Sequence, residues 1–329
     1  MSNLTDILFK FDFWGSLLLG YPLNIILIIL IIFKTPKEME THSRILIQNC
    51  VLDILFLTYV MFAQMFHIID ADGNSVLIFT DGIFIEFIKN NFDKIICKSF
   101  ILTGNFFYIT ILYGLCAQFV FRYLILNRHK FITVLIYRNM TINYRTYLFY
   151  MFSTVFVVGS FYNLICIFYA MNYFDGGIKH FDEEYLNKTL PFVIMKSEVY
   201  LTALIMTFVI VILPYLIIFI CGFKMVYYVN LHTGLSQNMK RLLKQLTKTL
   251  IILIFIPFIN QIFILLVLFF IAYNNRMNSS TKENDILNLI YIFLSIFTHF
   301  MPVFNPIVCI ITNKPYKEAV FKTLRIHPQ

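Results

Sequence analysis

A few polar residues interrupt long apolar stretches of this chain, and their side chains are the ones that could do chemistry. Asn49 and Asp53 lie four residues apart, so they share one face if that stretch is helical. A buried carboxylate is costly unless it is protonated, hydrogen-bonded or bound to a cation. Asp53 is therefore expected to be a hub of hydrogen bonds or a sodium site. A lone Asn or Pro in an apolar helix is more often structural, as a kink or an interhelical hydrogen bond.

The stretch FNPIVCIITNKPYKEAVFKTLR, residues 304–325, places an Asn-Pro pair inside an apolar run and then turns basic. Pro306 removes a backbone hydrogen bond and should bend the helix there, leaving Asn305 free to bond toward Asp53. Residues 315–325 predict a short amphipathic helix on the inner leaflet, with cations near anionic lipid. Its apolar face would carry Tyr316, Val320, Phe321 and Leu324. The alternative is a disordered basic tail.

The elements that position these residues follow from composition. The chain of 329 residues is 59% hydrophobic and 13% charged, whereas soluble proteins carry about 25% charged residues. A membrane-spanning helix needs ~20 largely apolar residues. Seven runs meet this need, at 11–33, 44–68, 95–122, 147–171, 199–228, 247–273 and 286–312. We therefore predict an all-α membrane protein in which residues 1–329 form a single seven-transmembrane helix bundle with a short amphipathic C-terminal helix.

Charge sets the orientation of the bundle. The loops after odd-numbered spans, with the tail, carry 17 Lys and Arg residues and three acids. The other side of the membrane carries 9 Lys and Arg residues and fourteen acids. Positive residues mark the cytoplasmic side, so the N-terminus is expected outside and the C-terminus inside, in a multi-pass plasma-membrane protein. Glycosylation triplets at Asn3, Asn187 and Asn278 fall outside, and one at Asn139 falls inside. The net charge of +8 is then a topology signal, and no nucleic-acid partner is expected.

The order of the polar residues resembles that of rhodopsin-like G-protein-coupled receptors over essentially the whole chain. The matching positions are Asn24, Asp53, Arg122, Pro214, Pro257, Asn305 and Pro306. The chain departs from that pattern where Phe121 replaces the acid before Arg122 and Cys309 replaces the Tyr of Asn-Pro-x-x-Tyr. Cys97 has no loop cysteine to pair with, so the usual outer disulfide is not expected.

Longer stretches resemble a narrower group, the nematode chemoreceptors of the Str-type superfamily, and most nearly their delta class (Srd). The stretches are TPKEM leading into SRILIQNCVLDIL, then FRYLIL, KRLLKQLTKTLIILIFIP and NPIVCIITNKPYKEAV. This resemblance implies a chemosensory receptor that binds a small-molecule cue from outside and signals through a heterotrimeric G protein. It also implies, on its own, sensory-neuron cilia as the location.

Residue roles follow from the resemblance and from position. Arg122 would be the inner-face switch, and without an acid at 121 its resting partner would be Glu40 or nothing, which predicts basal activity. The expected G-protein contacts are Arg122, Tyr123, Lys240, Arg241 and Lys244, of which the last three could equally be topology-setting charge. The outer halves of the spans offer Asn105, Tyr108, Asn260, Gln261 and His299 as ligand-binding residues, although His299 could be a satisfied core histidine.

Other functional classes fit less well. A seven-span transporter would be expected to show repeats and paired broken helices, which the sequence lacks. A ligand-gated channel of the insect odorant type would have its N-terminus inside, which the charge count opposes. An enzyme would need clustered His, Asp or Glu at metal spacing, and the seven histidines are scattered. Apart from the sodium alternative at Asp53, no cofactor or metal site is predicted.

Overall fold

The computed structural model describes residues 2–35, 40–69, 74–126, 144–170, 175–180, 188–195, 197–231, 237–276 and 281–324. Its helices are α1 (Ser2–Lys34), α2 (Glu40–Phe62), α3 (Ile85–Asn90), α4 (Lys94–Leu126), α6 (Tyr144–Ile165), α7 (Ser197–Leu231), α8 (Gln237–Arg276), α9 (Thr281–His299), α10 (Met301–Thr312) and α11 (Lys314–Leu324), with a π-helical turn, η2 (Cys166–Ala170), after α6. Six helices are long and apolar enough to cross a membrane, and the bent pair α9 and α10 makes a seventh span. The predominantly helical seven-span fold is therefore confirmed.

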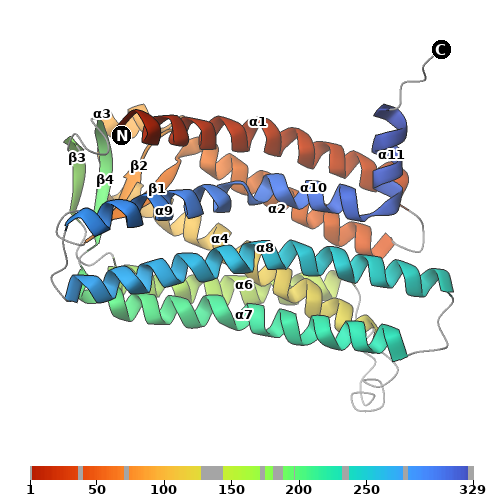
Figure 1. Ribbon diagram of the computed structural model, residues 1–329. Helices are drawn as coiled ribbons and strands as arrows, with labels where there is room; N and C mark the ends of the chain where they lie inside the picture. The colour runs from red at the N-terminus through yellow and green to blue at the C-terminus, as the bar shows by residue number, and fades with distance from the viewer. Residues whose placement is uncertain are drawn as a thin grey trace.

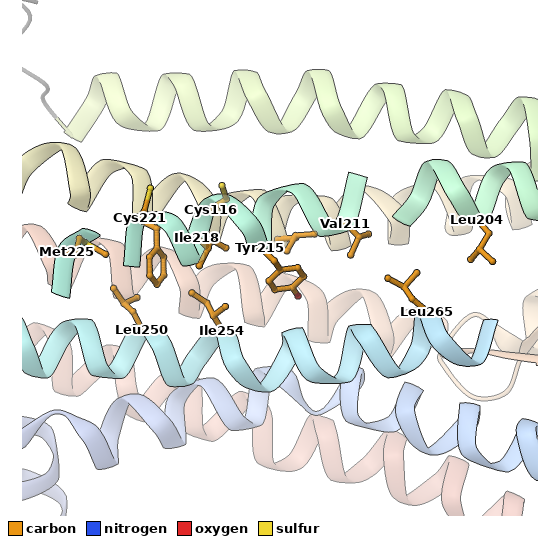
Figure 2. Packing of buried hydrophobic residues seen from close by; sticks show 12 residues of the cluster. Cys116, Leu204, Val211, Tyr215, Ile218, Cys221, Met225, Leu250, Ile254 and Leu265 are labelled. Atoms are coloured by element: carbon orange, nitrogen blue, oxygen red, sulfur yellow. The ribbon is translucent and has the colours of Figure 1, made fainter. Parts of the chain in front are cut away.

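The long helices run side by side in one elongated bundle (Figure 1). α1 packs against α2 and α10, while α4 packs against α6 and α7. The largest buried cluster joins α4, α7 and α8, and Figure 2 shows side chains of α7 directed toward α8. Tyr215, Ile218 and Ile254 are nearly free of solvent or lipid contact there. Many large apolar side chains elsewhere stay exposed, among them Phe33, Phe223 and Tyr227. Such an apolar exterior suits lipid as the surrounding solvent.

A four-stranded antiparallel sheet sits at one end of the bundle, beside the N-terminus (Figure 1). Its strands are β1 (Met65–Ile69), β2 (Ser75–Phe79), β3 (Asp175–His180) and β4 (Thr189–Met195), in the order β1-β2-β4-β3. The prediction of a second span reaching residue 68 was therefore wrong. α2 ends at Phe62, and the following apolar residues form β1 instead of a last helical turn.

Both faces of the central strand β2 are covered, which explains why this sheet forms. Successive side chains of a strand point to opposite faces. Val76 and Ile78 pack against residues of α1 and α9. Leu77 and Phe79 pack on the other face beside Ile88 of α3 and the start of α4. The sheet is thus a packed layer between helices.

Pairing of β2 with β4 connects the segment after α2 to the segment before α7. The sequence offered no disulfide to make such a connection. All six cysteines are free. Cys97 is completely buried in an apolar cluster with Leu77, Phe79 and Val193. Backbone hydrogen bonds and apolar packing therefore hold this end of the bundle together.

The seventh span bends by 51° between α9 and α10, around Phe300. The sequence predicted the bend at Pro306, and this was wrong, because α10 continues through that residue. Pro302 lies in the first turn of α10 and has no N–H for the Thr298 carbonyl, so α9 cannot continue past this point. The hydrogen bond that Pro306 cannot make is supplied from another helix, as described below.

The short helix α11 follows α10, near the predicted amphipathic helix at 315–325, whose last residue lies outside the described part of the chain. The apolar face of α11 differs from the prediction in one respect. Tyr316 is buried against Leu27 and Cys309, and its hydroxyl lies 2.8 Å from Oγ1 of Thr35. Phe321 is 53% exposed. Part of the expected lipid-facing side therefore packs on the bundle and helps to fix the direction of α11.

Candidate functional site

Asp53 lies at the centre of the bundle and is 3% exposed. The Nδ2 atom of Asn305 lies 3.1 Å from each of its carboxylate oxygens, so the hydrogen bond expected between α10 and α2 is present. No cation among the described residues forms a salt bridge with Asp53 at the usual distance. The carboxylate is thus stabilised by an amide and keeps unused acceptor capacity.

Asn24 compensates for the proline inside α10. Its Nδ2 atom donates to the carbonyl oxygens of Gly20, at 2.9 Å, and of Pro302, at 2.8 Å. In an uninterrupted helix the Pro302 carbonyl would accept from the residue four positions on, which is Pro306 and has no N–H. The amide of Asn24 therefore fills a vacancy in the backbone ladder of α10, and it links that helix to α1.

Toward the opposite end of the bundle from the sheet, the polar core continues to Arg122. Asn49 and Gln118 exchange hydrogen bonds between α2 and α4 through their amides. Arg122 follows one turn after Gln118 and is 3% exposed. Its Nε and Nη2 atoms have no hydrogen-bond partner in the described part of the chain. The neighbouring Phe121 stacks on Tyr147 with ring centroids 4.5 Å apart, at the position where the pattern discussed above has an acid. Packing replaces charge at that position.

A cavity of about 70 Å³ lies between Asp53 and the bend of the seventh span. Its polar lining comes from Asp53, Tyr108, Asn260, Gln261 and Thr298, and Asp53 is its only carboxylate. The Tyr108 hydroxyl is buried and has no partner among the described residues. The remaining lining residues are Tyr215, which also carries a hydroxyl, and the apolar residues Phe56, Ile111, Leu112, Leu115, Pro257, Met301 and Pro302. The arrangement suits a small, largely apolar molecule that can accept a hydrogen bond from Tyr108.

The structure separates the five residues expected to bind a ligand. Tyr108, Asn260 and Gln261 line the cavity, and Nδ2 of Asn260 also holds α9 through the Leu294 carbonyl at 3.2 Å. Asn105 lies one turn away and donates to Sγ of Cys166. His299 does not line the cavity either, because its Nδ1 atom lies 2.6 Å from Asp12.

Asp12 and Gln64 are buried polar residues that the sequence reading passed over. Asp12 is the only acid between residues 7 and 33, in the run FKFDFWG, so its position within an apolar helix was a usable signal. Gln64 comes directly before β1 and is completely buried. Neither residue has a sequence neighbour that would reveal its partner.

The other predicted site residues lie at the margins of the described structure. Tyr123 lies 5.8 Å, measured from its ring centroid, from the ammonium group of Lys224. The side chains of Glu40, Lys240, Arg241 and Lys244 fall outside the described residues, although the backbones belong to α2 and α8. Of the three outer glycosylation triplets, Asn187 and Asn278 lie outside the described part of the chain, and Asn3 is described in its backbone alone.

Comparison with known proteins identifies a family for this sequence and a solved structure with a similar fold. A family model described as serpentine type 7TM GPCR chemoreceptor Srd matches residues 11–322. The crystal structure of squid rhodopsin is similar in fold, with a TM-score of 0.63 and 15% identity, over 98% of this chain and 86% of the rhodopsin chain. No curated protein matches the sequence significantly.

Proposed function

Since this chain belongs to the Srd family of serpentine 7TM GPCR chemoreceptors, we propose that it binds a small-molecule cue from the extracellular side and signals through a heterotrimeric G protein. The family is one of receptors and not of enzymes, and the chain is a multi-pass membrane protein. One observation carries the proposal. The cavity beside Asp53 is lined in part by Thr298, Met301 and Pro302, which are the residues at the bend of the seventh span. An occupant of the cavity would therefore contact the point at which that span changes direction.

The size of the cavity constrains the cue. Pockets for drug-sized ligands have volumes of about 300–1,000 Å³, several times that of the cavity described above. The cue is therefore small, or the bundle opens when it binds. Tyr108 would donate to it, Asn260 and Gln261 would orient it, and the apolar walls would supply most of the binding energy.

Signal transfer is proposed to occur by population shift, in which the cue binds one arrangement of the bundle more tightly than another. Arg122 is the proposed switch, because two of its buried nitrogens lack partners in the part of the chain that the structure describes. A buried cation with unused donors favours any arrangement that supplies an acceptor. Tyr123, Lys240, Arg241 and Lys244 are the proposed contacts for the G protein on the same side. Because these two nitrogens of Arg122 have no partner among the described residues, we propose that the receptor signals measurably in the absence of cue.

The orientation proposed from charge places the sheet and Asn3, Asn187 and Asn278 outside the cell, and Arg122 and α11 inside. Epitope tags at the two ends test it in intact cells. Labelling of the N-terminal tag alone supports the receptor topology, whereas labelling of neither or of both ends contradicts it. A seven-span channel with its N-terminus inside would expose only the C-terminal tag.

The function is tested by screening small organic cues in cells that express the receptor with a G-protein reporter. Arg122→Ala should abolish both basal and cue-driven signalling at unchanged surface level. Arg145→Ala is the matched control, because Arg145 is an exposed arginine at the start of α6. Signalling that survives in Arg122→Ala, or that is lost equally in Arg145→Ala, would refute the assigned role.

A further inference from the structure

Asp12 is a completely buried carboxylate in α1, held by side chains from two distant parts of the chain. Its Oδ2 atom lies 2.6 Å from Nδ1 of His299 and accepts a hydrogen bond from Nε2 of Gln64, also at 2.6 Å. Its Oδ1 atom is buried without a partner among the described residues. Buried contacts between polar side chains of this kind contribute little net stability, and their best-attested role is to fix one arrangement of elements. The question is which arrangement Asp12 fixes.

Gln64 connects Asp12 to the sheet. Its backbone N–H donates to the Asp81 carbonyl at 2.8 Å, and its carbonyl accepts from the N–H of Thr80 at 3.1 Å. Its side-chain Oε1 accepts from Oγ1 of Thr80 at 2.8 Å. Gln64 is therefore fixed to the end of the β1–β2 hairpin by both backbone and side chain. A displacement of this hairpin must move the amide that Asp12 binds.

His299 connects Asp12 to the bend. It is the last residue of α9, immediately before Phe300. α9 is joined to the sheet along its length, because the amide of Asn288 bonds both the N–H and the carbonyl of Ile69, at 2.8 and 2.9 Å. Ile292 and Ile296 pack with the sheet residues further along. The sheet and α9 thus form one packed unit, and His299 is the end of that unit nearest the bend.

The same region of α1 also seats the bend itself. A Cβ atom added to Gly15 would lie 2.9 Å from Cζ of Phe300, so only glycine leaves room for this ring without a shift. The ring of Phe11 stacks on Phe300 with centroids 5.7 Å apart. Phe11 and Gly15 of α1 therefore lie against Phe300, and Asp12 between them contacts His299. Beyond the bend, α10 is held separately by Asn24 and Asp53.

We propose that Asp12 is a positioning residue that couples the outer sheet to the bend of the seventh span. A displacement of the β1–β2 hairpin is transmitted through Gln64 and Asp12 to His299, and it changes the angle between α9 and α10 over the seat at Gly15. The coupling between sheet and bend stands on geometry alone. Only its effect on signalling rests on the function proposed above.

Hydrogen–deuterium exchange on the purified full-length receptor tests the coupling without any ligand. Three amides report on the bend. The N–H of Phe300 donates to the Ile296 carbonyl, and the N–H groups of Val303 and Phe304 both donate to the Phe300 carbonyl. Asp12→Asn keeps the size of the side chain and removes its charge. It should speed exchange at the bend and in residues 64–69 together, by about tenfold, because local opening free energy sets exchange protection. Asp6→Asn is the matched control. It removes the ion pair between Asp6 and Lys188, 2.9 Å apart, which also links α1 to the sheet but lies away from the bend.

Unchanged exchange at the bend in Asp12→Asn, or the same increase in Asp6→Asn, would overturn the proposal. If Asp12→Asn does not yield folded receptor, His299→Asn replaces it, because it removes the contact to Oδ2 of Asp12 from the side of α9. Faster exchange in residues 64–69 as well as across the bend supports the coupling, and faster exchange at the bend alone overturns it.

A double-mutant cycle then tests whether Asp12 acts through His299. Basal signalling per surface receptor is measured in Asp12→Asn, His299→Asn and the double variant. Each single change should alter it by about 5- to 150-fold, the usual range of coupling between sites, and the double variant should stay within about twofold of a single one. Multiplying effects would show that the two residues act separately. If the wild-type receptor does not signal, the proposed function fails, while the exchange experiment still decides the coupling.

Discussion

Replacing Asn24 with alanine should weaken α10 because it orphans one backbone carbonyl. The Pro302 oxygen cannot receive the usual N–H from residue 306, which is a proline, and it accepts from Nδ2 of Asn24 at 2.8 Å. Interhelical hydrogen bonds in membranes contribute about 0.6–1.7 kcal/mol, and an unsatisfied buried acceptor costs about 1–3 kcal/mol. The Oδ1 atom of Asn24 is itself buried without a partner among the residues that the structure describes, and its removal offsets part of the loss. We therefore expect a net destabilisation of about 2 kcal/mol, on the same magnitudes.

Thermal unfolding followed with a thiol-reactive dye suits this receptor, because five of its six free cysteines are buried. At roughly 2 °C per kcal/mol for a chain of this length, Asn24→Ala should lower Tm by about 4 °C. Asn163→Ala is the matched control. Asn163 likewise donates across helices, to the Leu102 carbonyl at 3.1 Å, and its Oδ1 atom has no partner within the described ranges. That carbonyl lies inside the uninterrupted α4 and keeps its own helical donor, so the fall in Tm should be at most half as large.

A compensating change makes the reasoning refutable. Pro306→Ala restores the N–H that the Pro302 carbonyl lacks, so Asn24→Ala should cost less in that background than in the wild type. An equal cost in both backgrounds would show that Asn24 stabilises the bundle in some way other than by completing α10.

Two further outcomes are expected. Burial lowers the pKa of His67 to about 4 from an ordinary value of 6.5. Between pH 6.5 and about 4, the unfolded chain therefore binds a proton at His67 that the folded protein does not bind, so stability falls as pH falls. Tm should drop across that window more in the wild type than in His67→Phe. Equal drops in Tm for the two proteins would contradict this. Because all six cysteines are free, dithiothreitol should leave Tm unchanged when unfolding is followed by circular dichroism, since the thiol-reactive dye would react with the reductant itself. A fall of several degrees would mean that a disulfide holds the end of the bundle that carries the sheet.

How far the sequence predicts this structure depends on how local each signal is. The spacing of Asn49 and Asp53 and the order of the polar residues predict the polar core, because helical periodicity alone puts them on inner faces. The bond between Asn305 and Asp53 follows from the same reasoning. The position of the bend does not, because Pro302 and Pro306 are chemically alike. Which of them breaks the helix depends on Asn24 of α1, whose partner lies 278 residues away.

The sheet was missed for a different reason. MFHII and SVLIF are short apolar runs separated by a segment with Asp, Gly and Asn, a pattern that also indicates a hairpin. The first run directly continues an apolar helix, and length alone assigns it to that helix. The pairing of β2 with β4 joins residues more than a hundred positions apart, so nothing local announces it. His299 was similarly ambiguous, and its partner Asp12 stands at the other end of the chain.

In the orientation proposed above, the sheet forms the outer end of the bundle, and the way this end is held bears on how such receptors can diverge. A disulfide would tie two fixed positions to one residue type. Backbone pairing does not depend on side-chain identity, and in the edge strand β3 the side chains of Ile178, Lys179 and His180 are exposed. Mutations can therefore accumulate on this strand at little cost to folding. Duplicated copies of such a gene could present different outer surfaces to the environment while sharing the same interior.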